Sequence, residues 1–257
     1  MITYTDMKKY TDINAETIDA WALDGWEWAR PVSHEEYVKA LNGEWKLYLT
    51  PTKAVPMEWF GDLKGKKVLG LASGGGQQGP LLTAAGASVT ILDYSPEQIR
   101  REKLVAEREG YEISAVRADM TERLPFDDEA FDLIFHPVSN CYIEDVEHVW
   151  RECFRVLKKG GALLAGLDNG MNFVFDEETE SRFANHLPYN PLKDKKLFDE
   201  AVKSGSGVQF SHGIEEQIDG QLRAGFMLTN VYSDTNGRGN LHDYGVASFW
   251  ATRAVKA

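Results

Sequence analysis

A glycine-rich segment, SGGGQQG at residues 73–79, is the first pattern in this chain whose residue types suggest chemistry. It follows an apolar run and opens a helical pattern. Its glycines let the backbone approach a ligand, and free N–H groups at a helix start attract phosphate or carboxylate. Read literally, Gly74-x-Gly76-x-x-Gly79 matches the dinucleotide-binding fingerprint of nicotinamide and flavin enzymes. A tight turn that binds no ligand is the alternative. The segment therefore predicts a binding loop, and other residues must identify the ligand.

A carboxylate stands about 20 residues beyond these glycines. Asp93 ends a second apolar run, residues 89–92, and precedes Tyr94 and Ser95. At this position a carboxylate can accept hydrogen bonds from both hydroxyls of a ribose, which every adenosine-containing cofactor offers. The alternative is that Asp93 caps the helix predicted to start at Pro96, a role that Ser95 fills equally well. Asp93 thus supports a nucleoside ligand without choosing between cofactors.

Strands and helices that alternate along the chain must position these residues. The strands are expected at residues 66–71, 88–92, 113–117, 131–136, 162–167, 226–232 and 246–255. The helices are expected at residues 78–85, 96–109, 144–157 (ended by Gly160-Gly161) and 214–224. This order predicts an α/β fold, a doubly wound, mostly parallel seven-stranded sheet. The last two strands are joined without a helix, so the final strand is predicted to be antiparallel.

Two segments lie outside this alternation. Residues 1–63 hold five of the seven tryptophans and predict an N-terminal helical cap, and residues 64–257 predict the main domain. Within that domain, residues 168–212 mix aromatics, prolines and charges and predict an inserted lid. The aromatics of residues 45–60 are expected to pack the cap onto the sheet, with lining of a substrate pocket as the alternative. Residues 50–53 are expected to close over the ligand.

Residues 66–166 resemble class I S-adenosylmethionine-dependent methyltransferases. In that family an acidic residue after the third strand accepts a hydrogen bond from the adenine amino group, and its neighbour packs on the ring. Asp119 and Met120 stand at those two positions. Three further stretches share the likeness: LPFDDEAFDLI at 124–134, ECFRVLKKGGALLAG at 152–166, and a terminal strand at 249–253 of the kind that the family inserts antiparallel into its sheet.

Two residues depart from the family's first motif. Gly70 stands where the family usually has an acidic residue, and Ala72 replaces the first loop glycine. That acid helps to hold the methionine end of the cofactor. Gln77, Gln78 and the loop's backbone N–H groups are therefore expected to take its place.

The resemblance implies S-adenosylmethionine as cofactor, S-adenosylhomocysteine as product, and no metal. The residues that it assigns to the cofactor are Ser73, Gly74, Gly75, Gly76, Gln77, Gln78, Asp93, Tyr94, Ser95, Asp119, Met120 and His136. The segment after the fourth strand should face the reacting methyl group, because ligands lie beyond the carboxyl ends of parallel strands. His136 is thus the candidate general base, and Asn140, Cys141 and Tyr142 are the candidates for substrate binding. Ordinary strand-end, turn and packing roles are the alternatives for all four.

Composition excludes other classes. The chain has 257 residues, 28 basic and 40 acidic, with a net charge of −12, so it would repel a phosphate backbone. It has no apolar run of ~18 residues that could span a membrane, no secretory signal, and two cysteines without metal-ligand spacing. We expect a cytoplasmic monomer or homodimer that acts on a small molecule, without nucleic-acid or membrane partners. The leading interpretation is a small-molecule methyltransferase. The alternatives are an NAD(P)-dependent oxidoreductase and a non-catalytic S-adenosylmethionine-binding protein.

Overall fold

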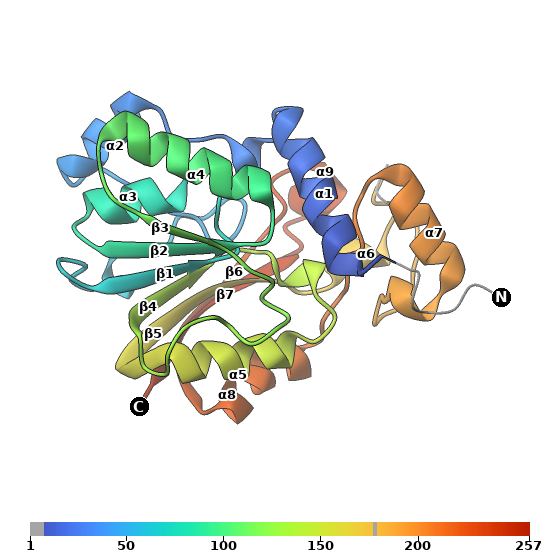
Figure 1. Cartoon of the computed structure of the whole chain (residues 1–257). Helices are drawn as coiled ribbons and strands as arrows, with labels where there is room; N and C mark the ends of the chain where they lie inside the picture. Colours follow the sequence, from blue (N-terminus) through green and yellow to red (C-terminus); the bar gives the residue numbers. More distant parts are fainter. Residues whose placement is uncertain (1–7, 177–178) are drawn as a thin grey trace.

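Seven strands form one mixed sheet in the order β3-β2-β1-β4-β5-β7-β6. The computed structural model describes residues 8–176 and 179–257, and Figure 1 shows helices on both faces of this sheet. The strands are β1 (Lys67–Leu71), β2 (Ser88–Asp93), β3 (Ser114–Arg117), β4 (Phe131–His136), β5 (Leu157–Asp168), β6 (Phe226–Asp234) and β7 (Phe249–Lys256). Neighbours from β3 to β5 run parallel, whereas β7 runs antiparallel to both β5 and β6. The predicted fold class, including the antiparallel last strand, is confirmed.

Central strands of this sheet are apolar along their length because both of their faces are covered. In β1, Val68, Leu69 and Leu71 are fully buried, and in β4 so are Ile134 and Phe135. Continuous burial of this kind is characteristic of parallel strands between two helical layers. The apolar runs in the sequence therefore mark the strands correctly.

The α-helices of the described residues are α1 (Tyr10–Leu23), α2 (His34–Leu41), α3 (Gln78–Ala84), α4 (Pro96–Glu109), α5 (Val146–Val156), α6 (Met171–Val174), α7 (Lys195–Ser204), α8 (Gly220–Ala224) and α9 (Gly239–Asp243). Some of them cover the two faces of the sheet. In Figure 1, α3 and α4 lie on one side of the strands, and α5 and α8 lie on the other. Helix α4 starts where the sequence predicts, because the Ser95 hydroxyl accepts from the Gln98 N–H at 3.0 Å and Pro96 occupies the first turn.

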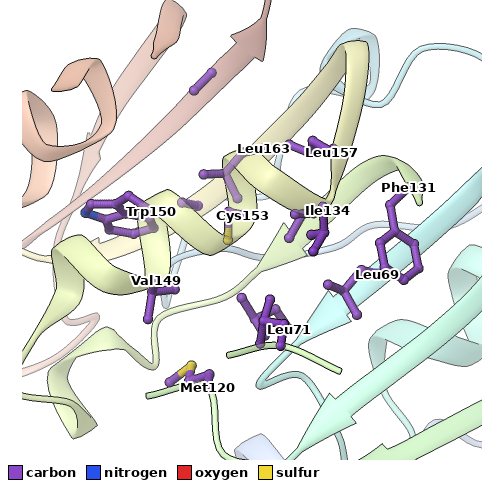
Figure 2. Close-up of a cluster of buried hydrophobic side chains, with 14 of the residues drawn as sticks. Leu69, Leu71, Met120, Phe131, Ile134, Val149, Trp150, Cys153, Leu157 and Leu163 are labelled. Atoms are coloured by element: carbon purple, nitrogen blue, oxygen red, sulfur yellow. The ribbon is translucent and has the colours of Figure 1, made fainter. Parts of the chain in front are cut away.

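One hydrophobic cluster lies between the sheet and α5. Figure 2 shows Val149, Trp150 and Cys153 of α5 beside Ile134 and Leu163 of the sheet. All five side chains are fully buried. Their spacing on α5 gives that helix a single apolar face. This apolar face packs α5 against β4 and β5 of the sheet.

The second cluster lies on the opposite face and includes the N-terminal aromatics. Trp45 packs edge-on against Phe60 with ring centroids 5.0 Å apart, and Phe60 stacks on Phe135 of β4 at 6.0 Å. Trp59 lies 5.3 Å from Tyr232 of β6. The expectation that these aromatics pack the N-terminal segment onto the sheet is confirmed. Large aromatic rings bury much apolar surface, which makes them effective here.

Two predicted boundaries around β5 are wrong. Helix α5 ends at Val156, and Leu157 is already extended and pairs with Phe131. Gly160 and Gly161, expected to end the helix, lie inside β5 instead. The left-handed φ of +76° at Gly160 lets the strand bend where its register with β4 shifts. A pair of glycines after a helical pattern marks an irregular strand here and not a helix stop.

The C-terminal helix lies where it is predicted, over residues 214–224, and Gly225 ends it in the left-handed conformation. Its middle, Glu215–Asp219, is a π turn, and α8 follows. The last strand differs from prediction: it begins at Phe249 and not at 246, because a short helix, α9, precedes it. The N–H of Val246 donates to the Leu241 carbonyl at 2.8 Å and therefore belongs to the turn after α9.

The segment expected to be a lid contains α6, α7 and irregular backbone. It lies beside α1, which is far from it in the chain (Figure 1). The Asn14 amide of α1 donates to the carbonyls of Val208 at 2.9 Å and Tyr142 at 3.0 Å, and its oxygen accepts from the Val208 N–H at 2.6 Å. One buried side chain thus joins α1, the 168–212 segment and the loop after β4. The division into cap, main domain and lid stays a prediction.

Candidate active site

A cavity of about 920 Å³ lies at the carboxyl ends of the parallel strands. Five strands contribute residues that lie at their carboxyl ends or directly after them. In sheet order from β3 to β5, these are Ala118, Asp119 and Met120; Asp93, Tyr94 and Ser95; Ala72, Ser73 and Gly74; Pro137, Val138 and Ser139; and Asp168. The cavity is therefore a long site that spans much of the sheet edge, at the place where parallel sheets hold ligands.

The walls opposite the sheet come from the predicted cap, from the predicted lid and from residues 236–249, but the sequence singles out none of their individual positions as ligand-binding. From the N-terminal segment they are Thr11, Asn14, Ala15, Ile18, Trp26, Glu27, Trp28, Tyr48 and Leu49. From the later segments they are Asn172, Phe173, Asp176, Glu180, Gln209, Asn236, Gly237, Arg238 and Phe249. Residues 50–52 also line the cavity, as expected of a segment that closes over the ligand. The other positions lie on α1, α6, β7, the 3₁₀ turn Glu27–Ala29 and connecting segments, and they carry no local motif.

The glycine loop uses its backbone N–H groups inside the protein. The N–H of Gly74 donates to Asp93 Oδ2 at 3.0 Å, that of Gly75 to the Gln98 carbonyl at 3.0 Å, and that of Gly76 to Glu102 Oε2 at 2.8 Å. Gly75 and Gly76 are not among the cavity-lining residues, whereas Gly74 is. The expectation that the N–H groups of these three glycines replace the missing acid is therefore wrong, because each already has an acceptor.

Asp93 is 8% exposed and lines the cavity. Besides Gly74, the Ser95 N–H donates to its carboxylate, to Oδ1 at 3.0 Å. Burial raises the pKa of Asp93 to about 6, and the hydrogen bonds from Ser95 and Gly74 oppose that rise. Ser95 caps α4, so Asp93 does not serve as its N-cap. A carboxylate oxygen can accept more than one hydrogen bond, so both oxygens of Asp93 keep acceptor capacity for a ligand.

Asp119 and Met120 stand side by side in the cavity wall beyond β3. Asp119 Oδ1 accepts from the Thr121 N–H at 2.9 Å and from its hydroxyl at 2.8 Å, which fixes the carboxylate. Met120 is 8% exposed and belongs to the cluster under α5. This pair therefore joins a fixed acceptor to an apolar surface, which suits the edge and face of a heterocyclic base.

His136 lies in the core and is not among the cavity-lining residues. Its Nδ1 lies 2.9 Å from the Leu71 carbonyl and donates to it, because a carbonyl can only accept. Its ring meets Trp150 edge-on at 6.0 Å. Burial lowers the pKa of His136 to about 4, so the ring is neutral at physiological pH. This position favours the strand-end packing role over the base role.

Of the three candidates for substrate binding after β4, two line the cavity and one lies in the interior. Cys141 and Tyr142 line the cavity, but Asn140 does not, because its amide donates to Gln217 Oε1 at 2.5 Å in the interior. Burial raises the pKa of the Cys141 thiol and of the Tyr142 phenol well above their usual values. Both groups are therefore neutral and serve as weak donors or packing surface.

Several buried polar atoms in the cavity wall have no hydrogen-bond partner within the described residues. They belong to residues on three sides of the cavity: Thr11 Oγ1, Ser73 Oγ, Gln78 Oε1 and Gln98 Oε1. These four atoms are covered by protein and do not open on the cavity, so the polar groups that a ligand meets there include the carboxylates of Asp93 and Asp119. These two acceptors and the apolar Met120 fit a nucleoside. Among the described residues, no group of three or more His, Cys, Asp or Glu could hold a metal ion.

Comparisons with known proteins agree with this geometry. A family model described as "Methyltransferase domain" matches residues 69–165. The chain is also 41% identical over 249 residues to "Uncharacterized methyltransferase YbaJ" of Bacillus subtilis strain 168, which covers 95% of this chain and 97% of that protein. The chain belongs to the class I S-adenosylmethionine-dependent methyltransferase family.

Two further comparisons concern the fold and the family. An S-adenosylmethionine-dependent methyltransferase structure from Mesorhizobium loti has the same fold, with a TM-score of 0.63, 19% identity, and coverage of 77% of this chain and 94% of that chain. "Sterol methyltransferase-like 1" of Botryococcus braunii is 32% identical over 152 residues, which are 57% of this chain and 39% of that protein. The resemblance stated from the sequence is confirmed.

The family assignment favours the methyltransferase interpretation over the oxidoreductase one, and the structure explains the misleading glycine pattern. A Cβ at Gly79 would collide with the Glu102 carboxyl group, and the N–H of Gly76 donates to that same carboxyl. The dinucleotide spacing in this methyltransferase thus leaves room for a buried glutamate. In the described residues, no helix is long and apolar enough to cross a membrane.

Proposed function

We propose that this protein transfers a methyl group from S-adenosylmethionine to a small-molecule acceptor by direct in-line displacement. The observation that carries the proposal is the extent of one cavity, which runs from Asp119 beyond β3 to Asp168 beyond β5. Pockets for single ligands range from about 300 to 1,000 Å³. A cavity near the top of this range leaves space for an acceptor beside a cofactor.

The cofactor residues divide along the cavity. Asp93 accepts from the two ribose hydroxyls, Asp119 accepts from the adenine amino group, and Met120 packs on the ring. Ser73, Gln77 and Gln78 line the cavity after β1, which supports their assignment to the methionine end. Gln77 and Gln78 take the place of the acid that Gly70 replaces, since the N–H groups of Gly74, Gly75 and Gly76 are already engaged.

When bound, S-adenosylmethionine supplies a methyl group activated by its sulfonium sulfur. The chain's own contribution is to hold the acceptor in line with that group and to exclude water, which is catalysis by proximity. Ala72, Val138 and Phe249 provide apolar wall, and Tyr142 closes the side toward α1. Neither the neutral His136 nor the neutral Cys141 takes part in covalent chemistry.

A small acceptor is favoured over a macromolecule by charge and by enclosure. The net charge of −12 opposes nucleic acid, and the cavity is covered by the N-terminal segment and by Phe173, Asp176 and Glu180. The relatives whose names describe sterol methyltransferases point to small acceptors as well.

The test follows the labelled methyl group. The protein is incubated with methyl-tritiated S-adenosylmethionine and either the small-molecule filtrate or the RNA and protein fractions of a bacterial extract. We expect protein-dependent label in compounds of the filtrate. Label confined to RNA or protein would contradict the small-molecule acceptor. S-adenosylmethionine binding without transfer to any fraction would favour the non-catalytic binding protein.

A further inference from the structure

The β5 end of the cavity lies away from the residues assigned to the cofactor. Asp168 ends β5, whereas Asp93 ends β2, and β1 and β4 lie between these two strands. Adjacent strands are about 4.8 Å apart, so three spacings separate the two strand ends by roughly 14 Å. Asp168 thus stands where a second ligand would lie, beyond the ribose and adenine sites.

Asp168 is a buried carboxylate without a cation. It is 7% exposed and lines the cavity. Its Oδ1 accepts from the Gly170 N–H at 2.8 Å, and its Oδ2 accepts from the Asn172 amide at 2.8 Å. Within residues 8–176 and 179–257 it forms no ion pair. Two neutral hydrogen bonds fix its direction, but they leave a buried charge that a cationic ligand would compensate.

The other two acids at this end of the cavity accept hydrogen bonds from neighbouring groups of the protein. Asp176 accepts from the Thr179 N–H and hydroxyl, both at 2.7 Å, and also from two later N–H groups in the same turn. Glu180 accepts from the Asn236 amide at 2.8 Å and the Leu241 N–H at 2.7 Å. These contacts shape the wall. Asp168 differs from both because it is buried, whereas Asp176 and Glu180 are partly exposed.

The titratable groups around Asp168 do not supply the missing charge. Cys141 and Tyr142 lie close enough for its charge to raise their pKa values, and both are neutral. His212 is the basic neighbour that lowers the pKa of Asp168, but its ring already faces Glu216, with Nδ1 and Oε1 3.6 Å apart. Arg238, on the cavity rim, is exposed to solvent. Burial dominates, and the pKa of Asp168 rises to about 6.

We propose that Asp168 binds the acceptor through an amine, and that this amine nitrogen is the atom that is methylated. This inference rests on the proposed function. The ammonium group docks on the carboxylate and gives it one proton, which leaves a neutral nitrogen with a lone pair. That lone pair forms the bond to the methyl carbon while the carbon–sulfur bond breaks and its electron pair stays on sulfur. The methylated product leaves as an ammonium ion, and Asp168 returns its proton to water.

A proton acceptor with a pKa of about 6 suits this role, because it is ionised at neutral pH and is more basic than an ordinary aspartate, so it can take the proton before the nitrogen attacks. Asn172 and Gly170 hold the carboxylate in a fixed direction, which lowers the cost of ordering it. The same site repels carboxylate and phosphate acceptors.

The test uses three matched probes, benzylamine, benzyl alcohol and benzoate, titrated by calorimetry into protein saturated with S-adenosylhomocysteine. We expect benzylamine to bind most tightly and benzoate not at all. Asp168→Asn should weaken benzylamine binding at least tenfold and leave benzyl alcohol binding unchanged. Asp132→Asn is the matched control, since it removes the same charge from a carboxyl group that lies outside the cavity and already accepts from the Lys67 N–H and from Lys158, and it should keep benzylamine affinity within about twofold.

Three results with the probes would overturn the proposal: no benzylamine binding by the wild-type complex, equal benzylamine affinities of wild type and Asp168→Asn, or benzoate binding as tight as benzylamine binding. A fourth comes from titration with S-adenosylhomocysteine. Titration of each variant with S-adenosylhomocysteine alone separates the two claims. A tenfold loss of that affinity in Asp168→Asn would place Asp168 at the cofactor and also overturn the proposal. If wild type binds no S-adenosylhomocysteine, the proposed function itself fails.

Discussion

The buried carboxyl group of Glu102 holds the glycine loop through the N–H of Gly76, which donates to Glu102 Oε2 at 2.8 Å. Glu102 is fully buried on α4, and its Oε1 has no partner within the described residues. The loop that forms one wall of the cofactor site is therefore fixed to α4 from behind. Because Gly76 has a φ of +75°, a side chain there would be strained as well as crowded by Val105.

Glu102 should make stability depend on pH. Burial raises its pKa to about 8, with the Gly76 hydrogen bond opposing and the Asp93 charge adding to the rise. Between its ordinary value and about 8, the folded state binds more protons than the unfolded state, so the free energy of unfolding falls as pH rises. The slope reaches about 1.4 kcal/mol per pH unit. Above pH 6 the carboxyls of Asp93 and Asp168 no longer contribute much, since their pKa values are about 6.

Glu102→Gln should remove most of this slope, because an amide keeps the acceptor for Gly76 and does not ionise. Urea unfolding of wild type and variant at pH 6, 7 and 8 measures it. We expect the variant to become the more stable protein as pH 8 is approached. Parallel pH profiles for the two proteins would show that Glu102 is ionised, or exposed, throughout this range.

Gly79→Ala should destabilise the protein although alanine is the better helix former. The added Cβ would collide with the Glu102 carboxyl group and lie 3.0 Å from Ile113 Cδ1. Overpacking of this kind costs about 1–3 kcal/mol. Thermal unfolding of Gly79→Ala, Glu102→Ala and the double variant forms a double-mutant cycle. We expect the double variant to recover part of the Gly79→Ala loss, and strict additivity would contradict the assigned contact.

Asp234 should fix the 50–53 segment over the cavity. Its Oδ2 accepts from the N–H groups of Thr52 at 2.8 Å and Lys53 at 3.0 Å, and its Oδ1 accepts from the Thr52 hydroxyl. Asp234→Ala leaves these donors unpaired, at a cost of about 2–3 kcal/mol in the free energy of unfolding. Urea unfolding checks that cost, and limited proteolysis checks the segment. A variant with unchanged stability and no new cleavage near residues 50–53 would refute this role.

Asp119→Ala should weaken S-adenosylhomocysteine binding less than Asp93→Ala does, because the adenine contact is a single hydrogen bond. About 1 kcal/mol, or roughly fivefold in affinity, is expected. Calorimetry measures the affinity, and thermal unfolding is the control, since Asp119 Oδ1 also orders Thr121. If the variant unfolds at the temperature of the titration, Asp119 is structural and its assignment to adenine is lost.

Local patterns predict the sheet and one half of the site. Apolar runs mark all seven strands, and the residues that directly follow the strands, such as Asp93 and Asp119, reach the cavity because parallel strands end at one edge. By contrast, the sequence does not reveal that Gly75 and Gly76 turn toward α4. That depends on Glu102, which lies 26 residues after Gly76 and looks like an ordinary helix glutamate.

The segments that cover the site are predicted as a cap and a lid, but the individual residues with which they line the cavity are not readable from local pattern. Asn14, on α1, reaches the cavity only because its amide joins Val208 and Tyr142, more than 120 residues away. Asp168 lies at the end of β5, but the residues next to it in the sequence do not reveal that its buried carboxylate has no cationic partner. His136 misleads in the opposite direction, since its position at a strand end suggests the cavity while its ring turns toward Trp150. Such outcomes depend on tertiary packing.

Calorimetric titration of the purified protein with S-adenosylhomocysteine and, separately, with NADH tests the central claim most directly. The account predicts micromolar binding of S-adenosylhomocysteine, no binding of NADH, and a loss of about 2 kcal/mol, roughly thirtyfold in affinity, in a folded Asp93→Ala variant. Binding of NADH alone would mean that the glycine spacing acts as a dinucleotide site after all. Unchanged S-adenosylhomocysteine affinity in folded Asp93→Ala would contradict the ribose assignment on which the site is built.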